Sequence, residues 1–417
     1  MRILRAVVLT LALSLAACAP ATRATLVLWH SLDGPRERAL LRLVDEWNAS
    51  NTAGAFVVPE RRTNVAQHAA VLRALGAGRM PGLILASPQQ AATYQQREAL
   101  VALDAFIDGP EGFKPNDKAD LFPFVQQAGR TPQGIWIGLP LGGEARVMLV
   151  NKQWLDERSL LVPETWDVFD KVCERAGDPA ESVACFGSVA DDAWLQEWLI
   201  AHGTRATGSS GALQLGSGEV RNALQPVDAL RQRGLVLSTI SDVQLREEFA
   251  FGRIVFAFDW SRNLKQLDAL AISRGGFEWS LAPLPSVGGV PASLQRAPLL
   301  IIPKSSAIIE RRAWSFMRWM LDTKQTAQWA MDTGELPARI SSLSLIDGER
   351  VPNGFLTLVQ RIGAHTQAEP LIASWPCARD AMADSAREIF STADLTATLG
   401  AAQSVASEQF ASDCPVQ

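Results

Sequence analysis

Residues 134–152 read GIWIGLPLGGEARVMLVNK, and this stretch decides how the rest of the chain is organised. Apolar runs on both sides flank a polar segment that contains Gly142 and Gly143, a pattern that predicts two strands joined by a turn. The two glycines would give this turn backbone freedom. Glu144 and Arg146 follow them and would project a carboxylate and a guanidinium. We therefore expect a hinge and a ligand contact within this stretch.

The composition describes a soluble globular protein of more than one domain. The chain has 417 residues, of which 47% are hydrophobic and 20% charged, so two domains are expected. Its net charge of -5 argues against a nucleic-acid surface, which needs a concentrated basic patch. Thirteen tryptophans supply large flat apolar faces, and we assign most of them to core packing.

Common catalytic and cofactor motifs are missing from the sequence. It has no Gly-x-Ser-x-Gly, His-Glu-x-x-His, phosphate-loop or dinucleotide-binding pattern. No cofactor or metal is expected, because no Cys-x-x-Cys occurs and the four histidines are scattered. The 44 acidic residues leave a glycan hydrolase open on residue types alone.

The N-terminus has the pattern of a targeting segment. Arg2 and Arg5 precede a short apolar region that is too short to span a bilayer. The following Leu-Ala-Ala-Cys ends at Cys18 and resembles a bacterial lipobox. We expect residues 1–17 to be a lipoprotein signal peptide and residues 18–24 a lipidated leader. A plain secretory peptide is the alternative, and both predict export.

Four further cysteines follow, and an even number in an oxidising compartment suggests two disulfides. Three pairings are possible, and we favour the two that close local loops, each worth about 3 kcal/mol. These pairings are Cys173–Cys185 and Cys377–Cys414.

Short apolar strands alternate with helices through the first part of the chain, which predicts an α/β fold. The segment at 82–86 (GLILA) is wholly apolar, as a buried parallel strand should be. A long helix is expected over 309–333 and a largely helical tail over 378–410. Further strands are expected at 25–30, 55–58, 254–258, 279–284 and 299–302.

The order of several segments resembles the family 1 extracellular solute-binding lipoproteins of bacterial ABC importers, which include maltodextrin- and glycerol-3-phosphate-binding proteins. The resemblance covers nearly the whole chain after the lipobox. It rests on the segments TLVLWHSLDGPRERALLRLVDEWN, PGLILASPQQAATYQQREALVALD, GIWIGLPLGGEARVMLVNKQWL, VPETWDVF, WSLAPLPSVGG and WAMDTGELPAR.

This resemblance implies a type II periplasmic-binding-protein-like fold. It has two α/β lobes, each a mainly parallel sheet flanked by helices, with the ligand in the cleft between them. The first lobe would comprise residues 24–142 and 297–339, and the second residues 144–296 and 340–417. The implied protein is a monomeric, lipid-anchored receptor in the periplasm or on the outer face of the cytoplasmic membrane, not an enzyme. It would bind a sugar and deliver it by hinge closure to a separate membrane permease.

The resemblance also places candidate ligand contacts. Glu144 would bond sugar hydroxyls, while Trp260 and Trp375 would stack on sugar rings. Small residues, Ala86 and Ser87, stand where maltodextrin binders have a stacking tryptophan, so the ligand need not be a maltodextrin. The remaining candidates are Ser87, Gln89, Gln90, Trp29, His30, Arg62, Arg262 and Glu335.

A phosphorylated polyol is the alternative ligand. Glycerol phosphate or a glycerophosphodiester would need a bidentate arginine. Four arginines are candidates for that role, but the carboxylate of Glu144 would oppose an anion, and we rank a neutral sugar first. These arginines are Arg62, Arg146, Arg262 and Arg296.

Overall fold

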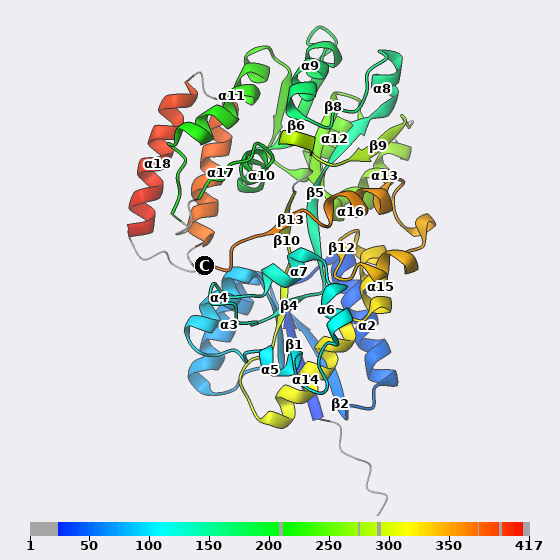
Figure 1. Ribbon diagram of the computed structural model, residues 1–417, viewed down its shortest axis with the longest axis vertical. Helices are drawn as coiled ribbons and strands as arrows, with labels where there is room; N and C mark the ends of the chain where they lie inside the picture. Colours follow the sequence, from blue (N-terminus) through cyan, green and yellow to red (C-terminus); the bar gives the residue numbers. More distant parts are fainter. Residues whose placement is uncertain are drawn as a thin grey trace, which may run out of the picture.

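A computed structural model describes residues 24–207, 212–273, 276–289, 293–373, 375–391 and 394–411. The chain forms two α/β lobes, drawn one above the other in Figure 1, which confirms the predicted architecture. The predicted signal peptide, Cys18 and Cys414 lie outside the described residues.

The first lobe, below in Figure 1, is built on a five-stranded sheet in the order β2-β1-β3-β11-β4. β1, β2 and β3 are parallel, whereas β11 runs antiparallel to both β3 and β4. The strands are β1 (Ala24–His30), β2 (Ala55–Arg61), β3 (Leu83–Ala86), β4 (Leu139–Pro140) and β11 (Leu299–Ile301). The helices are α2 (Gly34–Ser50), α3 (Asn64–Ala77), α4 (Pro88–Gln96), α5 (Asp104–Ile107), α6 (Pro115–Ala119), α7 (Pro123–Ala128), α14 (Ala307–Met320) and α15 (Thr323–Thr333).

The second lobe is built on an eight-stranded mixed sheet with a path of β13-β10-β5-β8-β6-β7, while β9 and β12 also pair with β5. Its strands are β5 (Gly142–Asn151), β6 (Ala184–Val189), β7 (Val236–Thr239), β8 (Ile254–Trp260), β9 (Trp279–Ala282), β10 (Ser293–Arg296), β12 (Leu336–Pro337) and β13 (Thr366–Ala368). Its helices are α8 (Lys152–Glu157), α9 (Trp166–Ala176), α10 (Asp192–Ala201), α11 (Gly218–Gln232), α12 (Asp242–Ala250), α13 (Leu264–Ser273), α16 (Phe355–Ile362), α17 (Trp375–Ser391) and α18 (Leu395–Ala411).

Short 3-10 turns complete the chain, and one of them bears on the lobe boundaries. They are η2 (Ser261–Asn263), η3 (Val287–Gly289), η4 (Ser341–Leu345) and η5 (Gly348–Arg350). In η4, Ser341 hydrogen-bonds Asp120 and Ser342 hydrogen-bonds Thr326, both on first-lobe segments. The chain therefore keeps contact with the first lobe beyond residue 340, and the predicted lobe boundaries stay a proposal.

The organising stretch crosses directly from one sheet to the other. β4 ends at Pro140 in the first sheet and β5 begins at Gly142 in the second, with a bend at Leu141 between them, so the turn predicted at Gly142 and Gly143 is wrong and both glycines lie in a strand. All ten residues of β5 are buried, because β8, β9, β10 and β12 pair along it. The stretch therefore joins the two lobes as a buried strand.

The role predicted for the two glycines is also wrong. Neither Gly142 nor Gly143 has a positive φ, so backbone freedom is not why they are glycines. A Cβ on Gly142 would lie 2.7 Å from the Trp329 ring and 2.8 Å from the Leu336 carbonyl oxygen, and one on Gly143 would meet Gln295 at 2.3 Å. Close packing excludes a side chain at both positions.

The long helix predicted over 309–333 is in fact two helices. α14 ends before Leu321, and α15 begins after Asp322, whose extended backbone is that of an N-cap residue. Trp314 and Trp329 are buried in the core as predicted, and Trp319 is partly buried. The helical tail is confirmed as α17 and α18, which pack against each other on the flank of the second lobe (Figure 1).

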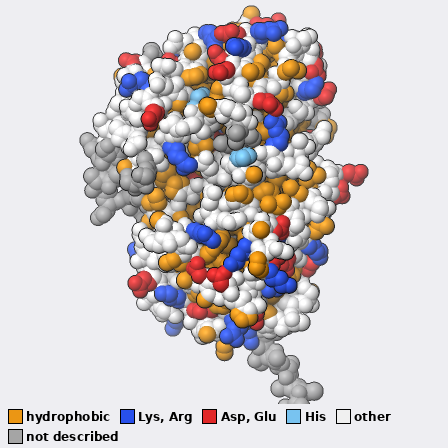
Figure 2. Space-filling model, in the orientation of Figure 1, with side chains coloured by type: hydrophobic (Ala, Val, Ile, Leu, Met, Phe, Trp, Pro, Cys, Tyr) orange, Lys and Arg blue, Asp and Glu red, His pale blue; other side chains and the backbone are white. Residues whose placement is uncertain are grey.

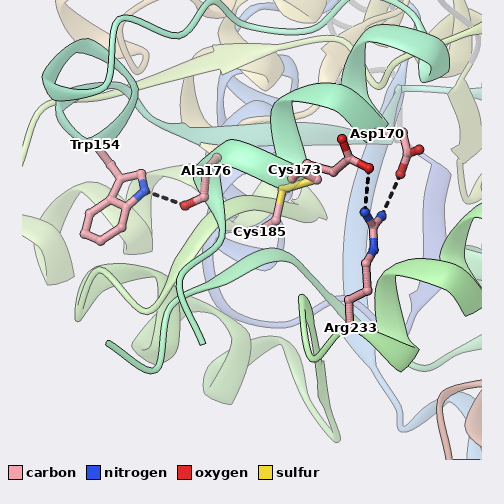
Figure 3. The surroundings of a disulfide bond; sticks show 7 residues. Trp154, Asp170, Cys173, Ala176, Cys185 and Arg233 are labelled. Carbon is pink, nitrogen blue, oxygen red and sulfur yellow. Dashed lines mark hydrogen bonds and ion pairs between the residues drawn. A yellow bond between two sulfur atoms is a disulfide. The ribbon is translucent and has the colours of Figure 1, made fainter. Parts of the chain in front are cut away.

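The predicted disulfide between Cys173 and Cys185 is present, with Cα atoms 5.1 Å apart, and it links α9 to β6. Figure 3 shows it between two other ties of α9: Trp154 Nε1 donates to the Ala176 carbonyl oxygen at 2.8 Å, and Arg233 pairs with Asp170 at 3.0 Å. Because Cys414 lies outside the described residues, the second bridge stays a prediction.

In the part of the chain that the structure covers, no helix is long and apolar enough to cross a bilayer. On the face drawn in Figure 2, acidic and basic side chains are interspersed, in keeping with the small net charge.

Gly142→Ala should destabilise the protein by about 1–3 kcal/mol, because its Cβ overlaps a buried ring and a backbone oxygen. Gly76→Ala in α3 is the matched control, since a Cβ there meets nothing within 4 Å and should be neutral or slightly stabilising. Urea unfolding of both variants measures the difference, and equal stability would contradict the packing role.

Candidate functional site

The ends of β5, β8 and β10 place four side chains on one face of the second sheet. Glu144 on β5 lies directly opposite Arg296 on β10, and Arg146 on β5 lies opposite Trp260 on β8. Directly opposed residues of antiparallel strands share a face, as do alternate residues of one strand. A carboxylate, two guanidiniums and an indole therefore meet where β5 enters the second lobe.

Glu144 is the centre of an ion cluster that joins the lobes. Its side chain is 8% exposed and accepts from Arg262 in η2 of the second lobe. Arg36, on α2 of the first lobe, lies 3.5 Å from the same Oε2 atom. The other nitrogen of Arg36 lies 3.5 Å from Glu335, so one guanidinium bridges two buried carboxylates.

Glu335 is the more deeply buried of the two acids in this cluster. It is 1% exposed, and its Oε2 atom accepts a 2.8 Å hydrogen bond from Trp329 Nε1. Burial raises the pKa of Glu335, and the nearby Arg36 guanidinium opposes that rise. Trp329, whose ring packs in the core, is thus also a hydrogen-bond donor at the site.

A second ion cluster surrounds Asp192 at the start of α10. Arg296 pairs with both Asp192 and Glu369, reaching the latter at 2.8 Å, and Arg379 of α17 reaches Asp192 at 2.9 Å. Burial alone would raise the pKa of Asp192, but the two guanidiniums lower it below its ordinary value. Gln89 on α4 of the first lobe donates to Glu369 at 3.3 Å, so this cluster also spans both lobes.

Trp260 lies between the two clusters and is 2% exposed. The guanidinium carbons of Arg146, Arg296 and Arg262 lie 4.9, 5.1 and 5.4 Å from its ring centroid. Cations at this range are attracted by the indole ring. The ring is therefore held in place by groups that belong to both ion clusters.

Arg146 is anchored by two acids, of which Glu197 is buried and Asp191 is partly exposed. It pairs with Asp191 at 2.8 Å and with Glu197 at 3.2 Å, and it donates to the Ser188 hydroxyl at 3.1 Å. Asp191 also accepts from the Trp194 amide as the N-cap of α10. Burial raises the pKa of Glu197 to about 8, against the pull of Arg146.

This arrangement is suited to holding a polar molecule rather than a metal. Within the described ranges, no group of three or more His, Cys, Asp or Glu side chains is placed to hold a metal ion. The acids at the interface are each paired with arginine, and the arginines with acids, so donors and acceptors alternate around one aromatic ring.

Residues 44–352 match the family of bacterial extracellular solute-binding proteins. The chain belongs to this family. Among curated proteins, no sequence matches it.

Solved structures agree on the fold of this solute-binding protein. The cyclic alpha-maltosyl-1,6-maltose binding protein from Arthrobacter globiformis superposes with a TM-score of 0.78 at 19% identity, covering 92% of this chain and 98% of the other. The sugar-binding protein MalE from Xanthomonas citri gives 0.79 at 19% identity, with 93% and 98% covered. A solute-binding protein from Agrobacterium radiobacter K84, in complex with ribitol, gives 0.71 at 20% identity, with 94% and 100% covered.

The predicted contacts fall into four groups. Glu144, Trp260, Arg262, Glu335 and Gln89 meet in or beside the two ion clusters of this solute-binding protein. Ser87 and Gln90 form a capping box at the start of α4, and Gln90 also donates to Asn64. Their side chains are thus already used to begin a helix next to Gln89.

Trp29, His30 and Arg62 form a separate group at the ends of β1 and β2. Trp29 Nε1 donates to Glu60 at 3.0 Å, and the Arg62 guanidinium lies 4.2 Å from the centroid of the Trp29 ring. His30 is 1% exposed, and burial lowers its pKa. None of these contacts joins either ion cluster.

Trp375 begins α17 and is 3% exposed within the apolar core of the second lobe. Its Nε1 atom is buried and has no hydrogen-bond partner among the residues that the structure describes. It also lines a small cavity of about 30 Å³ beside Arg205 and Gln367. The side chain is therefore packed as a core residue with one edge toward a polar cavity.

Sequence reasoning missed several members of the two clusters. The sequence could have indicated Arg36 as a site residue, because it follows a strand and lies in the first turn of the helix that begins at Gly34-Pro35. Asp192 and Asp191 follow β6, a strand that was not predicted. No local sequence pattern could have indicated Glu369 or Arg379. They join Arg296 in the cluster from positions 73 and 83 residues later in the chain.

Glu197→Gln should flatten the pH dependence of stability. An acid whose pKa rises from 4.5 to about 8 on folding binds more protons when folded. Its stabilising contribution is therefore complete below pH 4.5 and is lost as the pH rises through 8. The neutral amide does not titrate, so the variant should lose less stability than the wild type over this interval, by more than about 1 kcal/mol.

Urea unfolding at a series of pH values measures this effect. The exposed Glu157→Gln is the matched control and should keep the wild-type profile. Parallel profiles for the wild type and Glu197→Gln would show that Glu197 is ionised throughout.

Proposed function

We propose that this chain is the extracytoplasmic receptor of an ABC importer and binds a neutral carbohydrate, a mono- or oligosaccharide, between its lobes. The observation that carries the proposal is the pair of charge-balanced clusters around Trp260, at the meeting point of both lobes. Sugars need flat aromatic faces for their C–H groups and fixed donors and acceptors for hydroxyls that lose water.

Charge balance favours a neutral ligand over a phosphorylated polyol. Arg36 and Arg262 are both paired with Glu144, and Arg296 and Arg379 are both paired with Asp192. A phosphate would have to displace these carboxylates, and it would then lie beside buried negative charge. A hydroxyl can instead accept from an arginine and donate to a carboxylate without changing the net charge.

Ligand binding acts by shifting an equilibrium between open and closed arrangements of the lobes. Opening separates Arg36 from Glu144 and Gln89 from Glu369, which are two of the contacts between the lobes. A sugar that contacts Glu144, Gln89 and Trp260 together bridges the same groups and so favours closure.

The known binders with this fold support the carbohydrate class. They include the proteins described as binding cyclic alpha-maltosyl-1,6-maltose, ribitol and alpha-D-tagatose. Each of these ligands is an uncharged polyhydroxylated molecule, in keeping with the balanced charges at the interface here.

The remaining parts of the proposal follow from the sequence. Cys18 carries a lipid after removal of residues 1–17, and the monomeric receptor delivers its ligand to a membrane permease without changing it chemically. Glu144, Trp260, Arg262, Glu335 and Gln89 are the primary contacts. Trp375, Ser87, Gln90, Trp29, His30 and Arg62 are proposed as secondary contacts. The lobes divide near residues 142–144, 296–297 and 339–340.

Neutral sugars should raise the melting temperature by mass action, because they bind the folded state alone. A thermal-shift panel of glucose, maltose, maltotriose, ribitol and glycerol 3-phosphate tests the ligand class. Stabilisation by a neutral member and none by glycerol 3-phosphate is expected, whereas stabilisation by glycerol 3-phosphate alone would overturn the neutral-ligand assignment. Recovery of cleaved sugar after long incubation would point to a hydrolase instead.

Glu144→Gln should weaken binding of the stabilising sugar about 10–100-fold, the effect of losing a hydrogen bond to a charged acceptor. Isothermal titration measures the change. Glu164→Gln is the matched control, because Glu164 pairs with Arg361 at an exposed position away from both clusters. Equal affinities for the two variants would remove Glu144 from the binding site.

A further inference from the structure

A second polar, aromatic pocket lies in the first lobe at the other end of α2. It is formed where the end of α2, the following loop and the second half of α14 meet, and its volume is about 440 Å³. Arg36 and Trp47 are 11 positions apart on α2, so the two sites are separated by about 16 Å along the helix axis. We call it the outer pocket; it is lined by Trp47, Ser50, Asn51, Thr52, Ala53, Glu111, Trp314, Ser315, Arg318, Trp319 and Asp322.

One indole ring of the outer pocket is available to a ligand. Trp314 is fully buried and its Nε1 donates to the Glu111 carbonyl oxygen at 3.1 Å. Trp47 is 5% exposed, whereas Trp319 is only partly buried and leans on Trp47, with ring centroids 5.5 Å apart and planes at 58°. Trp319 therefore presents an aromatic surface that the buried rings of Trp47 and Phe316 support.

Two lining residues of the outer pocket contain buried polar atoms without a partner. Trp47 Nε1 is a donor and Asn51 Oδ1 an acceptor, and neither makes a hydrogen bond within the described residues. Asn51 uses only its Nδ2 atom, which donates to the Trp47 carbonyl oxygen at 2.8 Å. Unpaired buried polar groups are rare in native proteins and call for a water or a ligand.

Charged groups of the outer pocket are mixed in sign. Arg318 donates from Nη1 to the Glu111 carbonyl oxygen at 3.1 Å. Its guanidinium has four further N–H donors that can point in other directions. Asp322 lies at the junction of α14 and α15, and burial raises its pKa while Arg318 opposes the rise. The pocket is lined by two acids, Glu111 and Asp322, and one arginine, and this excess of acidic side chains disfavours an anionic ligand.

We propose that the outer pocket is a second saccharide site, independent of the interface between the lobes, that takes one or two neutral sugar rings. Its volume lies within the range of about 300–1,000 Å³ typical of small-molecule sites. The face of Trp319 covers the C–H face of a sugar ring. Asp322 and Asn51 Oδ1 accept from hydroxyls, and Arg318 and Trp47 Nε1 donate to them.

Indole N–H resonances test this site directly. Titration of the full chain with glucose, maltose and cellobiose should shift the Trp47 and Trp319 signals with one of these probes, with a Kd on the order of 1 mM. The shifts should persist in Glu144→Gln, because that variant alters only the interface between the lobes. Trp47 and Trp319 signals that stay fixed with all three probes would overturn the proposal, even if the Trp260 signal moves.

Two variants separate the outer pocket from general effects on folding. Trp319→Ala should abolish the Trp47 shift, and Ser315→Trp should do the same by filling the pocket without removing a core ring. Trp154→Ala is the matched control, since Trp154 is a partly buried tryptophan of the second lobe, covered by Arg158. A Trp47 shift that survives in both pocket variants would also overturn the site.

Discussion

The contact between Arg36 and Glu144 joins the two lobes, and the rest of the site is arranged around the cost of burying that carboxylate. A buried charge that loses its only partner is strongly destabilising. Glu144 avoids this because Arg262 belongs to the same lobe and stays with it when Arg36 leaves. Glu369 is held in the same way, because Arg296 remains when Gln89 withdraws. On the proposed opening, no acid is left without a counter-ion, and each lost contact becomes a position for a ligand hydroxyl.

The proposed ligand contact at Glu144 and the link between the lobes lie on the same strand, β5, and close packing rather than backbone freedom accounts for its two glycines. Gly142 and Gly143 are extended residues on which Trp329 and Gln295 pack directly. This packing brings Trp329 close enough to donate to Glu335, which in turn lies within reach of Arg36. The lack of a side chain at Gly142 and Gly143 therefore helps to set where the ion cluster lies. The pairing of β5 with its neighbouring strands sets the direction in which Glu144 points.

Local patterns in the sequence predicted what is local in the structure. The apolar strands, the helical tail and the disulfide between Cys173 and Cys185 are set by residues near one another in sequence. The break at Asp322 was missed, because the amphipathic pattern continues through it. Glu144 and Trp260 were identified through a resemblance to known receptors. Their arginine partners depend on contacts such as Arg36 with Glu144, which are 108 residues apart, and no local pattern specifies such pairs.

The measurement that tests the central claim most directly is mass spectrometry of any small molecule released by denaturing the protein purified from the cells that make it. A neutral mono- or oligosaccharide is expected, because the arginines and acids of the two ion clusters are already paired with one another. A phosphorylated or otherwise anionic ligand, released in stoichiometric amount, would contradict this expectation.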